Sequence, residues 1–419
     1  MRIDLQYGEG TLRLEDGTLS TMEELRPKTA VGFEDLRSEI DRVLMSPVGT
    51  DSLPSLIACD DSVAVVVEGP VLHTHAGVVL DAILSILIGK VVDPEQVTVI
   101  VSANETGTTN LAEWDKRLGS PTSRGFSLSI HDPHRDERLI EIGTTPTHSV
   151  PIQLNGQFAS ADFKIGIGAI HQSTFTGATG GRAAVLPGVA GVKTRARHLK
   201  LLAQTHFDVF DITTPACQNM VEASQLAGLN FIVNTIEDWR GTVAEVVAGD
   251  PIRPWEQGVS TAVTLANVPQ EQRFDIAMVS AGGYLGDVTL YSAMEALHSG
   301  LTATRRDGVI VLVAECSRGV GPEGFLRGVT CSTSEPDVMS IIESEFEIGM
   351  ERVRYLRRVQ DTRRVIICSE LRPSLVEEEL RCVAVSDAQE GFEVARNMTK
   401  TRARIAAFAN GTRTNPTVI

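Results

Sequence analysis

Uninterrupted runs of β-branched and aliphatic residues constrain the fold of this 419-residue chain most strongly. Three of these runs, VAVVV, VTVIV and VIVLVA, occupy residues 63–67, 97–101 and 309–314. A strand that is apolar on both faces is typical of a parallel sheet covered by helices on both sides. The sequence therefore predicts an α/β protein with largely parallel sheets flanked by helices.

The remaining segments continue this alternation of short apolar strands with longer helical stretches. The segment 336–359 follows Ser334 and has Pro336 at its start, which favours the beginning of a helix. The expected strands are 62–67, 97–102, 162–168, 230–234, 275–280, 308–314, 364–369 and 382–385. The expected helices are 76–88, 290–301 and 336–359.

A change in composition near residue 270 predicts a boundary between two domains. Pro251, Pro254 and Pro269 precede the polar run QEQR, and a new apolar strand follows it. We therefore expect an N-terminal domain over 1–272 and a C-terminal α/β domain over 273–419. A ligand cleft is expected between the two domains, with the C-terminal domain closing it.

The composition narrows the classes of function. Apolar residues make up 42% and charged residues 22%, which is typical of a soluble globular protein. The net charge of −16 argues against nucleic acid or an anionic membrane as the main partner. The most apolar stretch, 76–92, contains Asp81 and Lys90, and the first residues, MRIDLQYGEG, lack a signal-peptide pattern. We therefore expect a cytoplasmic location.

A Gly-rich segment after the strand FKIGIG is the most informative local feature. Glycines between a strand and a helix expose backbone N–H groups, which favour binding of an anion such as phosphate. Hydroxyl and guanidinium groups in the same segment would add donors. The alternative is a tight turn packed against a neighbouring element. The predicted cofactor-binding residues are Thr176, Gly177, Thr179, Gly180, Gly181 and Arg182.

At this point the chain resembles a known family, the nickel-dependent lactate racemases, which use a nickel-pincer nucleotide. The matching runs are ADFKIGIGAI, GATGGRAAVLPGVAG, LNFIVNTIED, VVAGD, SAGGYLGDVTLYSAMEAL and VLVAEC. Their order and spacing follow the family from about Cys59 to Arg318, and a weaker likeness continues to the C-terminus. The resemblance implies hydride chemistry at a carbon that bears a hydroxyl group, with a histidine that removes the hydroxyl proton.

The resemblance also implies how the cofactor is held. In the family one histidine ligates nickel, and here it corresponds to His198, at a spacing one residue short of the usual pattern. The family's lysine that forms a covalent link to the cofactor is replaced by Ala183. We therefore expect a nickel-pincer nucleotide that is not covalently attached.

Several other positions depart from the family's pattern. Its catalytic histidines correspond to Ser173 and Thr106, and its substrate-binding arginine corresponds to Val71. Glu68 stands where the family has an acidic residue. Tyr291 keeps the aromatic hydroxyl, whereas Ser292 and Glu295 replace a glutamine and a lysine. Loss of positive charge disfavours a 2-hydroxy acid. A neutral, polyhydroxylated substrate such as a sugar, or a cationic one, fits better.

Three histidines are candidates for the missing base. His171 lies two residues before Ser173, and an imidazole can take and give a proton near neutral pH. His73 and His75 follow a strand end and would share one face if extended, which suits a proton relay. The alternatives are a buried histidine bonded to the backbone for His171, and turn or helix-capping histidines for the other two.

Two functions therefore remain open. The first is a racemase or epimerase that inverts a hydroxyl-bearing carbon, with His171 or the His73/His75 pair, Tyr291 and Glu295 as catalytic residues. Glu68, Thr106, Ser173 and Ser292 would then bind substrate. The second is a paralogue without nickel chemistry that binds a nucleotide or small molecule in a regulatory role. The expected partners are a small-molecule substrate and the proteins that make the cofactor, and an oligomer is possible.

Overall fold

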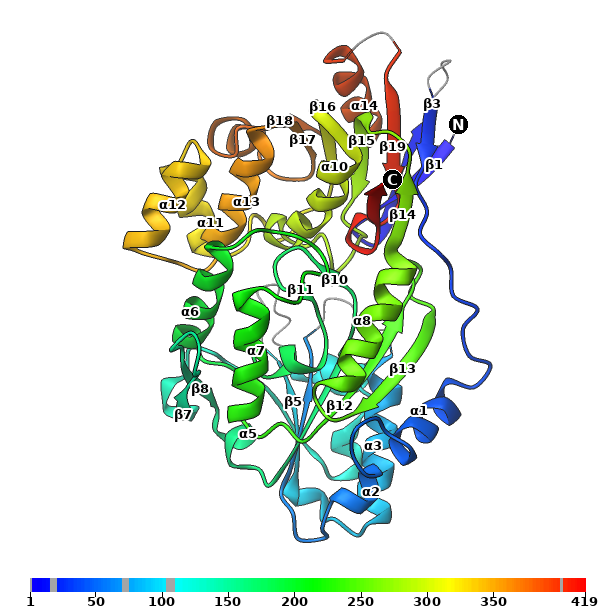
Figure 1. Cartoon of the computed structure of the whole chain (residues 1–419), viewed down its shortest axis with the longest axis vertical. Coiled ribbons are helices and arrows are strands. Elements are labelled where there is room, and N and C mark those ends of the chain that lie inside the picture. Colours follow the sequence, from blue (N-terminus) through cyan, green and yellow to red (C-terminus); the bar gives the residue numbers. More distant parts are fainter. Residues whose placement is uncertain (1, 16–20, 70–74, 103–109, 400–401) are drawn as a thin grey trace.

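The computed structural model contains two α/β units, each built on a six-stranded sheet (Figure 1). It describes residues 2–15, 21–69, 75–102, 110–399 and 402–419. In both sheets nearly all neighbouring strands run parallel, and helices cover both faces. The predicted α/β class with largely parallel sheets is therefore confirmed.

The N-terminal sheet has the strand order β13-β12-β9-β4-β5-β6. Only β12 and β13 pair antiparallel among these strands. The strands are β4 (Val63–Val67), β5 (Val97–Val101), β6 (Ser127–Ile130), β9 (Phe163–Ala169), β12 (Phe231–Glu237) and β13 (Val243–Gly249). Alternate residues of β4 belong to different cores: Val63, Val65 and Val67 pack in one cluster, and Ala64 and Val66 in another. This is why the run VAVVV is apolar at every position.

Helices form a layer on each face of this sheet. On one face lie α1 (Leu36–Met45), α2 (Leu53–Leu56), α3 (Ala76–Gly89) and α4 (Leu111–Arg117). On the other lie α5 (Gly156–Ser160), α7 (Pro215–Leu226) and α8 (Arg253–Ala266), while α6 (Val192–Ala203) extends toward the C-terminal unit (Figure 1).

The C-terminal sheet has the strand order β18-β17-β16-β15-β19-β3, and all these strands run parallel. The strands are β3 (Thr21–Glu24), β15 (Phe274–Ser280), β16 (Thr304–Val313), β17 (Arg364–Cys368), β18 (Val383–Val385) and β19 (Arg404–Phe408). One face is covered by α9 (Leu290–Ala293), α10 (Leu297–Ala303), α11 (Glu323–Cys331), α12 (Glu335–Ser344) and α13 (Met350–Gln360). The other face is covered by α14 (Ala388–Asn397) and the hairpin of β1 (Arg2–Tyr7) and β2 (Gly10–Glu15).

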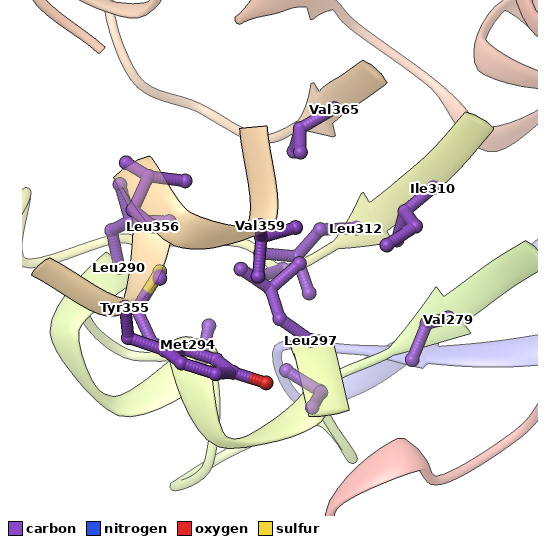
Figure 2. Close-up of a cluster of buried hydrophobic side chains, with 14 of the residues drawn as sticks. Val279, Leu290, Met294, Leu297, Ile310, Leu312, Tyr355, Leu356, Val359 and Val365 are labelled. Carbon is purple, nitrogen blue, oxygen red and sulfur yellow. The ribbon is translucent and has the colours of Figure 1, made fainter. Parts of the chain in front are cut away.

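The core on the first of these faces fixes α13, which contributes to the functional site. Figure 2 shows Tyr355, Leu356 and Val359 of this helix packed toward Leu290, Met294 and Leu297. All six side chains are buried in one continuous cluster. Burial of several large apolar side chains stabilises such a helix by several kcal/mol, about 1.5–3 kcal/mol each. The helix is therefore a rigid support for the polar residues on its first turn.

A single boundary at residue 272 does not separate the two units. Strand β3 pairs with β19, and the β1–β2 hairpin packs on the C-terminal sheet, so residues 2–24 as far as described belong to the C-terminal unit. The predicted N-terminal domain over 1–272 is wrong in this respect, although the boundary near 272 does separate the two large sheets. Three short pairs complete the fold: β7 (Leu139–Thr144) with β8 (Pro151–Asn155), β10 (Gln172–Ser173) with β11 (Gly177–Ala178), and β14 (Asn267–Gln270) with β20 (Asn415–Val418).

The expected helix over 336–359 is also divided into α12 and α13. Gly349 lies between them with φ +113°, and a Cβ there would stand 2.4 Å from the backbone nitrogen of Phe325. Helix α12 ends at Ser344, and this left-handed glycine is the N-cap residue from which α13 begins. Among the described residues, no helix is long and apolar enough to cross a membrane.

Candidate active site

A cavity of about 250 Å³ lies where the two units meet. The N-terminal unit supplies the end of β4, the Gly-rich segment and α6, and the C-terminal unit supplies α9, the first turn of α13 and the turn after β19. Parallel strands point their carboxyl ends toward this region, which is where α/β proteins bind ligands. The predicted site residues that line it are Glu68, His171, Ser173, Thr176, Thr179, Tyr291, Ser292 and Glu295.

The Gly-rich segment lies directly on β9, and this explains its glycines. A Cβ on Gly168 would stand 3.0 Å from the amide nitrogen of Gly181, and one on Gly166 would stand 2.9 Å from its carbonyl oxygen. The amide of Gly181 donates to Asn234 Oδ1 at 2.7 Å, and the amide of Thr179 donates to the carbonyl of His171 at 3.0 Å. These amides are already engaged, so the close-packed turn describes this segment better than the predicted phosphate cradle.

The glycines of the loop proper face neighbouring elements rather than the cavity. Gly177 has φ +74° and a Cβ there would stand 2.4 Å from the carbonyl oxygen of Asp211. Gly180 has φ +96° and abuts Ile170 and Asn234. Neither glycine lines the cavity, whereas Thr176 and Thr179 do. The cavity therefore meets this segment through its threonines, and the Thr179 hydroxyl is already bonded to the backbone of β9 at 2.7 Å.

Arg182 does not face the cavity either. Its side chain is buried, and the guanidinium lies 3.7 Å from the centre of the Trp255 ring and 3.5 Å from Cys217 Sγ. Burial lowers the pKa of this arginine, partly offset by Cys217. The predicted anion-binding role of Arg182 is therefore wrong for this conformation. The guanidinium instead makes a cation–π contact with Trp255, beneath the Gly-rich segment.

His171 lines the cavity, and its ring has a defined tautomer. Its Nδ1 lies 2.8 Å from the carbonyl oxygen of Gln172, so Nδ1 carries the proton and donates. In the neutral ring Nε2 is then the proton acceptor. The ring is half-buried at the end of β9. This arrangement is what a general base requires.

The other histidines predicted as catalytic do not reach the cavity as far as the structure describes them. His75 is the N-cap residue of α3, and its Nε2 donates to the carbonyl of Gly241 at 3.1 Å. It does not line the cavity and its side chain makes no cap bond to α3, so the alternative of a turn histidine describes it. His73 and the predicted substrate-binding residue Thr106 lie outside the described residues.

Glu295 joins the two units. Its Oε2 accepts from the amide of Thr174 at 2.8 Å, and its Oε1 accepts from Ser173 Oγ at 3.2 Å. Arg352 lies 3.4 Å from the same Oε1 and balances its charge. The carboxylate that sequence reasoning assigned to catalysis therefore fastens the Gly-rich segment to α9 and α13.

Residues of α13 form a part of the site that sequence reasoning missed. The guanidinium of Arg352 lies between two rings, 4.2 Å from the centre of Phe175 and 3.9 Å from that of Tyr291. The Tyr291 hydroxyl donates to Glu351 Oε1 at 2.7 Å, and both residues line the cavity. Burial raises the pKa of Glu351. No local motif marks these positions, because only the packing of α13 brings them to the cavity.

His198 is fully buried in the middle of α6, one layer behind the cavity wall. Arg195, Leu199 and Leu202 of the same helix line the cavity, whereas His198 does not. Asn219 Nδ2 donates to His198 Nδ1 at 3.2 Å, and Nε2 is buried without a protein partner among the described residues. Burial, helped by Arg195, lowers the pKa of His198 to about 4. The ring is therefore neutral at physiological pH, as a metal ligand must be.

Within the described ranges, no group of three or more His, Cys, Asp or Glu side chains could hold a metal ion. A metal at His198 would thus depend on ligands from a bound molecule. Because Asn219 Nδ2 donates to Nδ1, the neutral ring carries its proton on Nε2, and Nε2 can bind a metal only if the Asn219 amide turns and the proton moves to Nδ1. After that change Nε2, which has no protein partner among the described residues, fits a single protein–metal bond, and the ring would also have to become accessible from the cavity.

Comparisons with known proteins agree with this architecture. Residues 7–207 match the family model described as the lactate racemase N-terminal domain, and residues 269–414 match the lactate racemase C-terminal domain. The lactate racemase of Thermoanaerobacterium thermosaccharolyticum is 24% identical over 98% of this chain and 97% of its own. The lactate racemase of Lactiplantibacillus plantarum is 25% identical over 78% of each chain.

Solved structures share the fold. The apoprotein of the T. thermosaccharolyticum lactate racemase superposes with a TM-score of 0.87 at 23% identity, covering all of both chains. A crystal structure of a protein from Thermotoga maritima gives 0.70 at 14% identity, covering 91% of this chain and 98% of that one. The two family models together span far more than half of the sequence. This chain belongs to the lactate racemase family.

Proposed function

We propose that the protein is a racemase or epimerase that inverts a hydroxyl-bearing carbon with the help of a nickel-pincer nucleotide. Family membership supports a racemase-type function in general. The observation that carries the finer proposal is His171, whose Nδ1–H is committed to the Gln172 carbonyl at 2.8 Å while the ring lines the cavity. A hydroxyl group next to this ring can lose its proton to Nε2 as hydride leaves the same carbon.

His198 is the residue that would ligate nickel. Metal binding at Nε2 requires the tautomer with the proton on Nδ1, and that proton needs an acceptor. Asn219 supplies one if its amide turns so that Oδ1 faces the ring, because amide oxygen and nitrogen occupy equivalent positions. Thr145, which now donates to Asn219 Oδ1 at 2.9 Å, would then face the amide nitrogen.

Ala183 bears on how the cofactor would be held. Its methyl group lines the cavity, so this position faces the bound molecule but offers no amine for a covalent bond. Thr176 lines the same space, whereas the Thr179 hydroxyl donates to the backbone of β9. We infer that the cofactor is held by hydrogen bonds and one metal bond, and that it exchanges with solution. The chemistry it supplies when bound is reversible hydride acceptance at carbon.

The proposed substrate is neutral and polyhydroxylated, such as a sugar. Hydroxyl-bearing residues from both units line the cavity, and the charge of Arg352 there is balanced by Glu295, so that arginine offers little charge to a substrate carboxylate. Glu295 is balanced by Arg352 and by the amide of Thr174, so it offers little charge to a cationic substrate. This favours the neutral substrate over the cationic one.

The test is inversion of configuration in D₂O. Protein produced together with the cofactor-biosynthesis proteins is incubated with sugars and 2-hydroxy acids, and the products are followed by NMR. We expect inversion of a sugar without deuterium at the inverted carbon, since hydride returns to the carbon it left. His171→Asn should abolish the reaction, and the exposed His206→Asn should not. Deuterium at the carbon would contradict hydride transfer, and activity in His171→Asn would contradict the assigned base.

A cofactor-free binding protein is the second candidate, and one observation favours it. His198 is fully buried and does not line the cavity, so a metal would reach it only after a local rearrangement. In this alternative the cavity binds a small molecule through its hydroxyl groups, and His198 is only a buried core residue of α6. It predicts no nickel in the purified protein and no loss of ligand binding in His198→Ala.

A further inference from the structure

The short strand β10 lies between the cavity and the C-terminal unit and is fastened to that unit at consecutive residues. Gln172 Nε2 donates to the carbonyl oxygen of Thr414 at 3.0 Å. Ser173 Oγ donates to Glu295, and the backbone amide of Thr174 donates to the same carboxylate. The segment belongs by sequence to the N-terminal unit, because it directly follows β9. Its backbone is paired with β11, whereas its side chains are fastened to the C-terminal unit.

Gln172, like Ser173 and Thr174, is buried. Only 5% of the residue is exposed, and its amide reaches the turn of residues 411–414 after β19. Ser299 Oγ lies 2.5 and 2.6 Å from the same two carbonyl oxygens, those of Gly411 and Thr414, and shares its single proton between them. These carbonyl groups are therefore held from the C-terminal side as well. The anchor for Gln172 is a rigid one.

The backbone of the same residue determines the state of the histidine. The carbonyl oxygen of Gln172 accepts from His171 Nδ1, and the carbonyl of His171 accepts from the amide of Thr179. The Gln172 side chain thus holds the peptide group to which the His171 ring is bonded. Moving Gln172 would move its carbonyl oxygen, which is the hydrogen-bond acceptor that favours the Nδ1–H tautomer of His171.

We propose that Gln172 is a positioning residue through which the C-terminal unit sets the tautomer and orientation of His171. When the two units are together, the amide of Gln172 is bonded to the turn after β19 and Nε2 of His171 is the proton acceptor. Without that anchor the acceptor of His171 Nδ1–H is held less firmly, and the preference for this tautomer is weaker. This inference rests on the proposed function for the importance of His171, but its geometry does not depend on the cofactor.

The test measures the tautomer of His171 in the apoprotein. The nine histidines are labelled with ¹⁵N, and long-range ¹H–¹⁵N spectra are recorded, with His171→Gln identifying its signals. The wild type is expected to show the Nδ1–H form. In Gln172→Met, which keeps the length but not the hydrogen bonds, the ratio of this form to the other should fall by about threefold to tenfold, the effect of one or two hydrogen bonds.

Gln270→Leu is a matched control. Gln270 is also 5% exposed, and its Nε2 also donates to a backbone carbonyl, that of Thr302, but it lies away from the cavity. This variant should leave the His171 signals unchanged. A folded Gln172→Met protein with the wild-type tautomer ratio would overturn the proposal, as would an equal shift in Gln270→Leu.

A second variant covers the case in which Gln172→Met does not fold. Ser299→Ala releases the same two carbonyl groups from the other side and leaves Gln172 intact. It should shift the tautomer ratio in the same direction by a smaller factor, and an unchanged ratio would overturn the proposal. Because no cofactor or substrate is present, a failed racemase assay leaves this result standing, and a failed tautomer result leaves the racemase proposal standing.

Discussion

Ser173 and Glu295 come from different units of the fold and are joined by a hydrogen bond of 3.2 Å from Oγ to Oε1. The family resemblance assigns these two positions to a catalytic histidine and a lysine. In this chain they bond to each other, and the amide of Thr174 adds a second bond to the carboxylate at 2.8 Å. Two positions predicted to act on substrate thus form part of the contact that holds the units together.

Replacing Glu295 should therefore weaken the protein. Glu295→Ala removes the acceptor of Ser173 and Thr174 and leaves Arg352 with less compensation. Loss of charge-assisted hydrogen bonds of this kind costs about 1–3 kcal/mol. Urea unfolding should show this decrease, and Glu347→Ala, which removes an exposed partner of Arg327 within the C-terminal unit, should change stability far less. Equal effects of the two variants would contradict the assigned contact.

Arg354 should be another stabilising contact between the units. Its Nη1 donates to the carbonyl oxygens of Ala203 and Thr205 at the end of α6, and its Nε lies 2.9 Å from Glu335 Oε1. Arg354→Met leaves those acceptors unpaired, and we expect the free energy of unfolding to fall by roughly 2–4 kcal/mol.

Arg327→Met is its matched control, since Arg327 pairs with acidic residues at the surface. Its effect should be below about 1 kcal/mol. A loss in Arg354→Met no larger than that in the control would show that the end of α6 is held by other contacts. Denaturant unfolding of the three proteins under the same conditions decides between the two results.

Arg182 should be replaceable without loss of anion binding. Its guanidinium is buried against Trp255 and does not line the cavity. We expect Arg182→Met to lower the free energy of unfolding by about 2 kcal/mol, because it removes a desolvated cation–π contact. Affinity for inorganic phosphate, measured by calorimetry, should change less than about twofold. A tenfold loss of phosphate affinity would restore the role that the sequence suggested.

Acid should destabilise the protein through His298. Burial lowers the pKa of this residue from 6.5 to about 4, although Asp208 opposes the shift. Between these pH values the unfolded chain binds a proton that the folded chain does not. Stability must therefore fall as the pH drops from 6.5 to 4, by up to about 3 kcal/mol for this group.

The variant His298→Gln isolates this contribution. Any loss of packing lowers the free energy of unfolding of the variant equally at every pH. Loss of the titrating ring instead changes the slope of that free energy against pH. Urea unfolding at a series of pH values should give a shallower decrease for the variant than for the wild type. Parallel curves for the two proteins would show that His298 takes up no proton on unfolding.

The strands were predictable because burial on both faces leaves a direct trace in the sequence. VAVVV and VIVLVA form β4 and the end of β16 as expected. The sequence near the N-terminus did not indicate which strand β3 pairs with, because its partner β19 is almost a whole chain length away in the sequence. Sequence pattern records which residues are buried locally, whereas the pairing of distant strands depends on the complete fold.

The site was predictable in part for the same reason. His171 and the hydroxyl groups of the Gly-rich segment follow a buried strand, and strand ends in α/β proteins lie at ligand sites. The guanidinium of Arg182 was misassigned because its neighbour Trp255 is distant in sequence. Arg352 and Glu351 were missed because α13 reaches the cavity only through packing of its opposite face, where Leu356 and Val359 are buried.

The metal content of the purified protein shows whether His198 binds nickel. The chain is produced with the cofactor-biosynthesis proteins, and nickel is measured per chain by mass spectrometry for the wild type, His198→Ala, and the exposed-histidine control His206→Ala. We expect about one nickel per chain in the wild type and the control and almost none in His198→Ala. A wild type without nickel would rule out the nickel-dependent reaction, and a His198→Ala protein that retains nickel would rule out His198 as the ligand.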